Sequence, residues 1–252
     1  MAKIPAKMDV NIDKPAPETG IAPQTEMRTL VPRRRRHFPK NYEERAELGV
    51  RELRVPATWE EFLELWETAD YRVFYRDGHM ISFLEIDEKT NAIMGEATIP
   101  HETLVMRFGA LLFNLLDNSE SNFQILGSNA KIFIAEDRKG YNADVTVVKG
   151  EPEIKEWKPA KRTSKGIVNP WLVVEVLSNS TRDFDLSEKL ADYKQIPSLQ
   201  QIIFVEQGSL WASTYIRVGA QEWRNLDFTS MSDKIPVADG CLSLERVFAK
   251  VL

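Results

Sequence analysis

The chain has a single cysteine, Cys241, in 252 residues. An intrachain disulfide needs two cysteines, and a multi-cysteine metal site needs more. No apolar run approaches the roughly 20 residues that a membrane-spanning helix requires. The N-terminal stretch Met-Ala-Lys-Ile-Pro-Ala-Lys-Met also lacks the apolar segment of a secretory signal. We therefore expect a protein of a reducing compartment, the cytoplasm, with no membrane partner.

The sequence also lacks an excess of positive charge. Lysine and arginine number 33 against 38 aspartates and glutamates, which gives a net charge of −5. Proteins that coat nucleic acid without specificity are usually strongly basic. A nuclease remains compatible with this balance, because an active site rich in carboxylates lowers the net charge and a bound metal restores positive potential locally.

The first 40 or so residues are rich in proline, lysine, threonine and alanine and show no apolar periodicity. This composition is typical of a disordered or extended arm. The arm ends in the run Arg33-Arg34-Arg35-Arg36, which can hold phosphates but is more often a solvated charge run. Residues 43–53 can form a short helix or a loose connection. We place the basic arm at 1–56 and one folded domain at 57–252.

The patterns after the arm predict a mixture of helices and strands, an α/β (α+β) class. A capping box at Thr58 and Glu61 starts the first helix, and Asp77-Gly78 indicates a hairpin turn. Helical apolar spacing covers 58–67, 98–116, 186–195 and 243–252. Strand patterns cover 71–75, 80–86, 123–134, 142–148, 169–178, 199–206, 210–218 and 222–228.

Two polar segments are candidates for the border of a binding site. His101 and Glu102 lie in the first turn of the helix at 98–116, where an acid suits the helix dipole and a histidine near a cleft can contact phosphate or metal. Residues 149–168 are predicted to be a charged loop, and long loops often border binding sites. Its basic residues can line a DNA channel, although an ordinary solvated loop explains them equally well: Lys155, Lys158, Lys161, Arg162 and Lys165.

Residues 169–178 form a near-continuous apolar run that is β-branched in its middle, which is typical of a buried strand. One carboxylate, Glu175, lies inside it. A buried acid is costly unless it is paired, hydrogen-bonded or bound to a metal. Asp144 begins another β-rich segment, and successive strands often lie side by side. Two converging acids make an oxygen-rich pocket suited to Mg²⁺ or Mn²⁺, although a turn residue at a strand start also explains Asp144.

A basic group for this pocket has to come from outside the strand. The residue on the same strand face as Glu175 is Leu177, which has no acid–base chemistry. On the following helix, Asp185, Lys189 and Tyr193 share one face. An ammonium at Lys189 can orient an attacking water or stabilise transition-state charge. The alternative is a surface lysine paired with Asp185.

At these residues the sequence resembles the Uma-type restriction endonuclease family of the PD-(D/E)XK nuclease superfamily. The segments that carry the resemblance are Ala143-Asp144-Val145 and residues 169–205, with weaker similarity from about 58 to 250. The resemblance implies a restriction-endonuclease-like core, with a mixed central sheet flanked by helices, and a metal-dependent endonuclease acting on nucleic acid, with DNA the expected substrate. It also implies a homodimer.

Carried over to this chain, the resemblance makes Asp144 and Glu175 the ligands of Mg²⁺ or Mn²⁺. Lys189 becomes the lysine that assists catalysis, because the superfamily's strand lysine has moved to the next helix in this family. His101 matches a histidine at the start of the family's long helix and is a secondary candidate. Glu102 and Tyr193 are two further secondary candidates.

The early hairpin departs from the family pattern Glu-Leu-Ile-Asp-Gly-Glu. Here it reads Phe74-Tyr75-Arg76-Asp77-Gly78-His79, so both acids are missing. This departure motivates a second hypothesis, a catalytically weak or inactive nuclease-fold module that binds nucleic acid or protein. A metal hydrolase acting on a small phosphate ester is less favoured, because the chain has no glycine-rich phosphate cradle.

Overall fold

A computed structural model describes residues 37–86, 90, 93–94, 98–117, 122–134, 137–158 and 163–252. The predicted arm up to residue 36, with its arginine run, lies outside the described residues, as do Lys161 and Arg162. No helix within the described ranges is long and apolar enough to cross a membrane.

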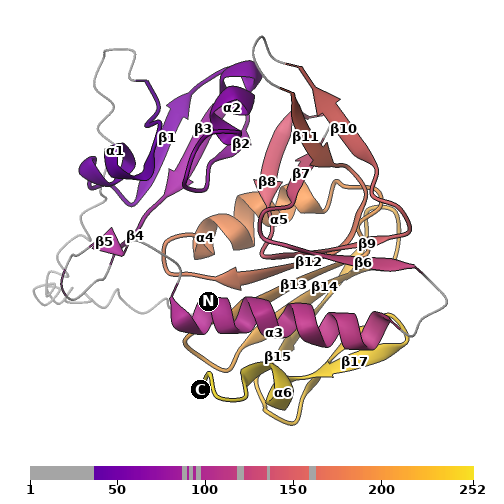
Figure 1. Cartoon of the computed structure of the whole chain (residues 1–252). Helices are drawn as coiled ribbons and strands as arrows, with labels where there is room; N and C mark the ends of the chain where they lie inside the picture. Colours follow the sequence, from indigo (N-terminus) through magenta and orange to yellow (C-terminus); the bar gives the residue numbers. More distant parts are fainter. Residues whose placement is uncertain are drawn as a thin grey trace, which may run out of the picture. The chain divides into compact units, whose positions relative to one another are not determined.

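Most strands belong to two large sheets, shown in Figure 1. The seven-stranded sheet has the order β1 (Glu52–Pro56), β3 (His79–Phe83), β2 (Phe74–Arg76), β8 (Lys139–Asn142), β7 (Lys131–Ile134), β11 (Ser164–Ile167) and β10 (Ile154–Trp157). The six-stranded sheet has the order β15 (Trp223–Phe228), β14 (Ala212–Arg217), β13 (Gln201–Glu206), β12 (Pro170–Leu177), β9 (Val145–Lys149) and β6 (Phe123–Gly127). Both sheets are mixed, because β11 and β7 run parallel, as do β12 and β13.

Two short hairpins and several helices complete the described structure. The hairpins are β4 (Glu85–Ile86) with β5 (Ile93–Met94), and β16 (Lys234–Val237) with β17 (Gly240–Ser243). The helical segments are α1 (Tyr42–Glu47), α2 (Trp59–Trp66), α3 (Ile99–Leu116), α4 (Arg182–Phe184), the π-helical turn η1 (Asp185–Lys189), α5 (Leu190–Tyr193) and α6 (Leu244–Phe248). The predicted mixed α/β class is confirmed.

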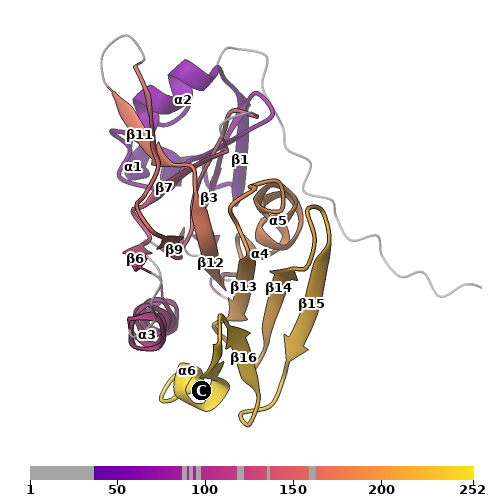
Figure 2. The same ribbon diagram turned by 90° about the vertical axis from the view of Figure 1, so that its right-hand side faces the viewer.

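The central strand β12 faces two different cores. Helices α3 and α6 cover one face of the six-stranded sheet, and the α4–η1–α5 segment covers the other (Figures 1 and 2). Leu172, Val174 and Val176 pack toward α3, whereas Val173 and Leu177 pack toward α5. Since side chains alternate along a strand, Glu175 shares the face that looks toward the α4–η1–α5 segment.

The local signals read from the sequence have the expected structural basis. Thr58 and Glu61 form a reciprocal capping box at the start of α2. Asp77 and Gly78 both have positive φ, 48° and 76°, which is the geometry of a tight two-residue hairpin between β2 and β3. Thr98 caps α3 by accepting a hydrogen bond from the backbone N–H of His101. The predicted hairpin and the first two predicted helices are confirmed.

Several segments differ from the sequence expectations, among them the C-terminal helix predicted at 243–252, which spans only Leu244–Phe248. Residues 149–168 are not simply a loop, because β10 and β11 form an antiparallel hairpin within them. Ile154, Lys155 and Glu156 are all exposed, so this edge strand has no apolar alternation for a pattern to detect. The structure also places α1 and β1 within residues 42–56, where β1 pairs with β3. That end of the predicted arm is part of the folded unit.

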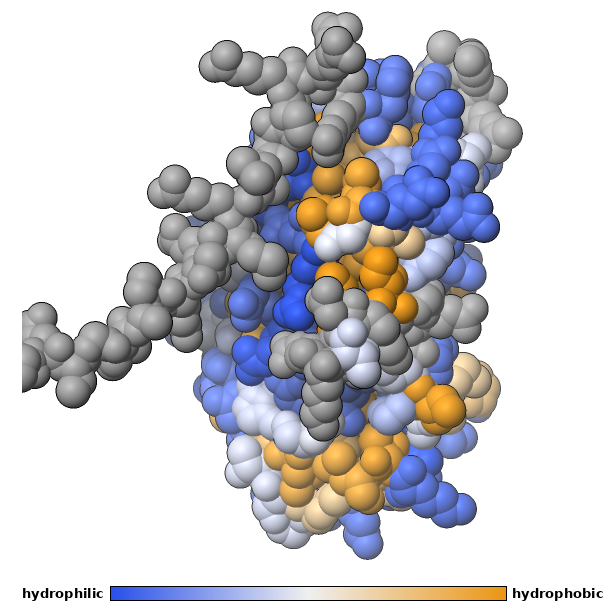
Figure 3. Space-filling view, turned by 90° about the vertical axis from the view of Figure 1, so that its left-hand side faces the viewer, coloured by the Kyte–Doolittle hydropathy of each residue, from blue (hydrophilic) through white to orange (hydrophobic). Residues whose placement is uncertain are grey.

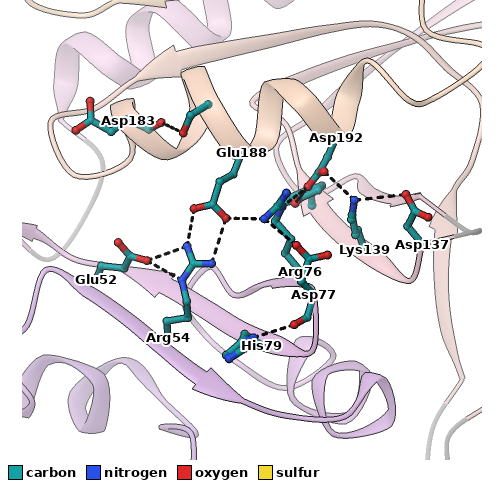
Figure 4. Close-up of polar contacts among 12 residues, drawn as sticks. Glu52, Arg54, Arg76, Asp77, His79, Asp137, Lys139, Asp183, Glu188 and Asp192 are labelled. Atoms are coloured by element: carbon teal, nitrogen blue, oxygen red, sulfur yellow. Dashed lines mark hydrogen bonds and ion pairs between the residues drawn. The ribbon is translucent and has the colours of Figure 1, made fainter. Parts of the chain in front are cut away.

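A cluster of ion pairs attaches the α4–η1–α5 segment to the seven-stranded sheet (Figure 4). The guanidinium of Arg54, from β1, donates through Nη1 and Nη2 to the two carboxylate oxygens of Glu188, at 3.1 and 2.8 Å. Arg76, from β2, donates to Glu188 at 3.0 Å and to Asp192 at 2.8 Å. Lys139, from β8, donates to the other Asp192 oxygen at 2.8 Å. We call Arg54, Arg76, Lys139, Glu188 and Asp192 the helix clamp.

The helix clamp fixes how the segment is rotated about its axis. Glu188 and Asp192 are four residues apart and therefore share one helix face. Asp185, Lys189 and Tyr193 occupy a neighbouring face, which packs against Glu175. Because both faces make ion pairs with fixed partners, the segment has one favoured orientation, and Lys189 is directed at β12.

Asp192→Ala tests the helix clamp. Asp192 is fully buried and accepts from two cationic groups. Its removal leaves Lys139 and Arg76 without their buried partner, so we expect a loss of about 3 kcal/mol or more in the free energy of unfolding, measured in urea. The matched control is Glu206→Gln, which breaks the more exposed 2.6 Å pair with Arg182 and should cost at most about 1 kcal/mol. Equal losses in the two variants would contradict this account of the clamp.

Candidate functional site

One cavity of about 330 Å³ gathers the residues singled out in the sequence. Asp144, Glu175 and Lys189 line it together with His101 and Glu102. Its walls come from the start of α3, the residue directly before β9, the end of β12 with the loop after it, the turn η1, and the segments around β2 and β3. Figure 3 views the molecule from the side at which α3 begins and β12 ends in Figure 1, and hydrophilic and hydrophobic areas lie side by side there. The two acids therefore share one cavity, as the sequence predicts.

Asp144 is held at the beginning of β9 by the neighbouring strand. Its backbone N–H donates to the carbonyl of Val174 at 3.1 Å, and its Oδ2 accepts from the N–H of Val176 at 2.8 Å. Its Oδ1 accepts from Arg72 Nη2 at 2.9 Å. His101 Nε2 lies 3.4 Å from Oδ2. The carboxylate is only 1% exposed, yet both of its oxygens have partners.

These partners decide the charge of Asp144. Burial acts to raise the pKa of the carboxyl group, but the hydrogen bond from His101, the charge of Arg72 and the Val176 N–H together outweigh burial. The pKa of Asp144 is therefore held well below its usual range, and the group is an anion at neutral pH. For His101, burial acts to lower the pKa, and the contact with Asp144 raises it on balance. An ionised carboxylate on a cavity wall is the form that binds a divalent cation.

Glu175 has a different electrostatic environment. It is 2% exposed, and its Oε1 lies 2.8 Å from Lys189 Nζ and accepts from the Tyr193 hydroxyl at 2.6 Å. Burial raises the pKa of Glu175 to about 7, against the opposing charge of Lys189. The acid that looked costly in the sequence is thus satisfied by two groups from the helix that follows β12.

Lys189 is buried, so the alternative of a surface lysine is wrong. The residue is 1% exposed, and Nζ lies 2.8 Å from Glu175, 3.3 Å from Asp185 Oδ1 and 3.2 Å from the carbonyl of Asn142. Burial acts to lower the pKa of this ammonium, but Asp185 and Glu175 raise the pKa on balance. Lys189 therefore stays charged and is suited to stabilising negative charge on the cavity side.

The backbone that presents Lys189 is a π-helical turn, η1, between α4 and α5. Such turns are rare and occur frequently at functional sites. Asp185 and Lys189 are its first and last residues. The helical spacing of 186–195 predicts the segment but gives no sign of this turn, because a π turn inserts into an otherwise α-helical pattern.

The three secondary candidates occupy unequal positions. His101 is 7% exposed and lies between Asp144 and Glu102, with Nδ1 3.4 Å from Glu102 Oε1. Glu102 lines the cavity with a largely exposed side chain. Tyr193 is fully buried and reaches the site through its hydroxyl, which donates to Glu175. His101 and Glu102 can therefore contact a molecule in the cavity, whereas Tyr193 supports Glu175.

Two further residues belong to the site that sequence reasoning did not select. Arg72 lines the cavity and pairs with Asp144, although it sits in a segment expected to be strand. Asp185 lines the cavity with a side chain that is only 5% exposed. A sequence signal existed for Asp185, which shares a helix face with Lys189. For Arg72, the only signal is its own position, two residues before Phe74 in a β-rich run.

The two missing hairpin acids have different consequences. Phe74 is buried and lines the cavity, and Lys189 Nζ lies 5.1 Å from the centroid of its ring. An acid at this position would face Asp144 and Glu175, so its absence changes the site. His79 is not among the residues lining the cavity, and its Nδ1 lies 2.9 Å from the carbonyl of Asp77. The second missing acid therefore leaves the cavity unaffected.

A divalent metal fits the donors that remain. The residues described by the structure contain no group of three or more acids, histidines or cysteines arranged around one point. Mg²⁺, however, keeps several waters and is usually held by one or two carboxylates together with substrate phosphates. Asp144 and Glu175 supply two hard oxygen donors on the wall of a cavity with room for water.

Comparisons with known proteins agree with this architecture. The chain is 30% identical over 141 residues to the uncharacterized protein sll1609 of Synechocystis. The aligned region covers 54% of this chain and 76% of that protein. The chain matches slr1290 of the same organism at 27% over 176 residues, covering 70% of this chain and 82% of that protein. The crystal structure of a "putative nuclease belonging to DUF820" from Anabaena variabilis has a TM-score of 0.55 at 15% identity.

That structure covers 78% of this chain and all of its own length, and the likeness shows a shared fold. A family model, Uma2, with the description "Putative restriction endonuclease", matches residues 59–247. This range contains both large sheets apart from β1, and every candidate site residue. It supports a nuclease-like function for the domain. The chain belongs to the Uma2 family.

Proposed function

We propose that this protein is a metal-dependent endonuclease that hydrolyses phosphodiester bonds, with DNA as its substrate. The observation that carries the proposal is the placement of Asp144 and Glu175, from two adjacent strands, in one cavity with a buried lysine. Two carboxylates and a cation on the wall of an accessible cavity are the groups that phosphodiester hydrolysis requires.

In this proposal Asp144 and Glu175 hold Mg²⁺ or Mn²⁺. When bound, such a cation lowers the pKa of a coordinated water and neutralises charge on the phosphate. Lys189 remains protonated between Asp185 and Glu175, so it stabilises developing negative charge instead of removing a proton. Tyr193 keeps Glu175 in place by donating to Oε1, and His101 orients Asp144.

Phe74 favours a second candidate function, a nuclease-fold module that binds nucleic acid or protein with weak or no turnover. The ring occupies the cavity position where the family pattern places an acid. A site with two acidic ligands in place of three binds metal less tightly in the absence of substrate.

The expected homodimer and cytoplasmic location stay predictions.

Plasmid cleavage distinguishes the two functions. With Mg²⁺ or Mn²⁺ the wild-type chain should nick or linearise plasmid DNA, and a chelator should stop the reaction. Asp144→Asn, Glu175→Gln and Lys189→Met should each lower the rate by about 100-fold or more, because each removes a charge or ligand at the reacting phosphate.

The matched controls for cleavage carry the same chemical changes elsewhere. Asp227→Asn alters an exposed acid on β15, and Lys194→Met alters a lysine five positions after Lys189. Neither residue lines the cavity, so both variants should retain wild-type rates. Activity that persists equally in the Asp144 and Glu175 variants would identify a contaminating nuclease and leave the binding module as the function.

Thermal unfolding tests the metal site without any need for turnover. A cation present at about ten times its Kd adds about 1.4 kcal/mol of stability, which corresponds to a rise in Tm of about 3 to 5 °C. We expect this rise for the wild type and for Asp227→Asn with Mn²⁺, and its reversal by chelator. Asp144→Asn should show no rise. An equal rise in Asp144→Asn would place the bound metal outside the cavity.

A further inference from the structure

Arg72 is the most exposed cation at the cavity, and its partner is among the most buried anions. The Arg72 side chain is 45% exposed, whereas that of Asp144 is 2% exposed. Their ion pair joins Nη2 to Oδ1 at 2.9 Å. Among the described residues, the Arg72 side chain donates its hydrogen bond to Asp144. Since a guanidinium carries five N–H donors and this ion pair uses one of them, the group can donate to a second partner.

The charges around Arg72 explain why it faces this carboxylate. Three carboxyl groups, those of Asp144, Glu175 and Asp185, act on Arg72 and raise its pKa, although burial opposes them. Lys189 already pairs with Glu175 and Asp185. Asp144 is the acid of this set that Lys189 does not contact, and its counter-charges are Arg72 on Oδ1 and His101 beside Oδ2.

A divalent cation would change this balance. It requires an oxygen of Asp144, and Oδ1 is the oxygen that Arg72 occupies, since Oδ2 already accepts from the Val176 N–H. A cation and a guanidinium repel one another when they share one carboxylate. The Arg72 side chain is 45% exposed, whereas Asp144 is held by backbone groups of Val174 and Val176 in β12. A guanidinium displaced from Asp144 would be free to bind an anion.

We propose that Arg72 is a mobile counter-ion that exchanges partners during the reaction. Without metal it pairs with Asp144, and with metal bound it turns into the cavity and binds a phosphate of the nucleic-acid substrate. This inference rests on the proposed function. A planar guanidinium suits a phosphate, because it donates two parallel hydrogen bonds to neighbouring oxygens. Arg72 is accordingly assigned a role in binding substrate phosphate and in limiting metal binding in the absence of substrate.

Chemical modification of arginine reports on this exchange directly. The full-length chain is treated with phenylglyoxal, an arginine-selective reagent, with and without Mn²⁺, and the modified residues are quantified by mass spectrometry. The release of one partly exposed ion pair should raise the reactivity of Arg72 about two- to fivefold when Mn²⁺ binds. In Asp144→Asn the reactivity should already be high without metal and should not respond to Mn²⁺.

Arg182 is the matched control for the modification. Its side chain is also 45% exposed and is paired with a carboxylate, Glu206, at 2.6 Å. It does not line the cavity, so Mn²⁺ should leave its reactivity unchanged. Binding of Mn²⁺ is measured on the same samples by electron paramagnetic resonance. Unchanged Arg72 reactivity with Mn²⁺ bound overturns the inference alone, whereas wild-type protein that binds no Mn²⁺ overturns the proposed function as well.

A second measurement tests whether Arg72 contacts a phosphate of the substrate. In Lys189→Met, where the proposed function predicts cleavage slowed by about 100-fold or more, a DNA duplex is added with Mn²⁺ and its binding is followed by fluorescence anisotropy. Bound DNA should return the reactivity of Arg72 to its metal-free level, and the double variant with Arg72→Gln should gain less DNA affinity from Mn²⁺ than Lys189→Met alone. High Arg72 reactivity with DNA bound would refute the phosphate contact.

Discussion

The ion pair between Lys189 and Glu175 is the interaction on which the site depends. Both side chains are almost fully buried, with Nζ and Oε1 2.8 Å apart. A buried charge without a partner costs several kcal/mol, so each of the two residues offsets the cost of burying the other. This requirement brings the helix after β12 back over the same strand. Asp185 and Tyr193 complete the environment, since each contacts one member of the pair.

The same helical segment is charged on a second side, and the two sides together explain its orientation. Glu188 and Asp192 pair with Arg54, Arg76 and Lys139 from the seven-stranded sheet. Apolar contacts alone tolerate small rotations of a helix, whereas hydrogen-bonded ion pairs have narrow geometry. Each of these residues therefore acts at a distance on the position of the Lys189 ammonium. The π turn η1 contains residues of both sides, Asp185 and Lys189 of one and Glu188 of the other.

The site residues that could be predicted from the sequence are those whose residue type conflicts with the pattern around them. Glu175 stood out because it interrupts a buried strand, and it led to Asp144 and Lys189, all of which line one cavity. Arg72 gave no such signal, because an arginine at the edge of a β-rich segment has an ordinary explanation on the surface. Its position depends on the packing of two sheets, which no local pattern records. The hairpin β10–β11 was missed for a related reason, since its edge strand β10 is exposed and carries no apolar alternation.

Phe74 gives the site its particular character. Its ring cannot bind a cation such as Mg²⁺ through oxygen, yet it lies 5.1 Å from the Lys189 ammonium and stabilises that charge by a cation–π contact. If Asp144 and Glu175 hold the metal, the remaining coordination positions belong to water and to substrate phosphate. Metal affinity then rises when substrate is present, and by thermodynamic reciprocity substrate affinity rises with metal. The replacement of an acid by a ring thus couples the two ligands more strongly than a three-acid site does.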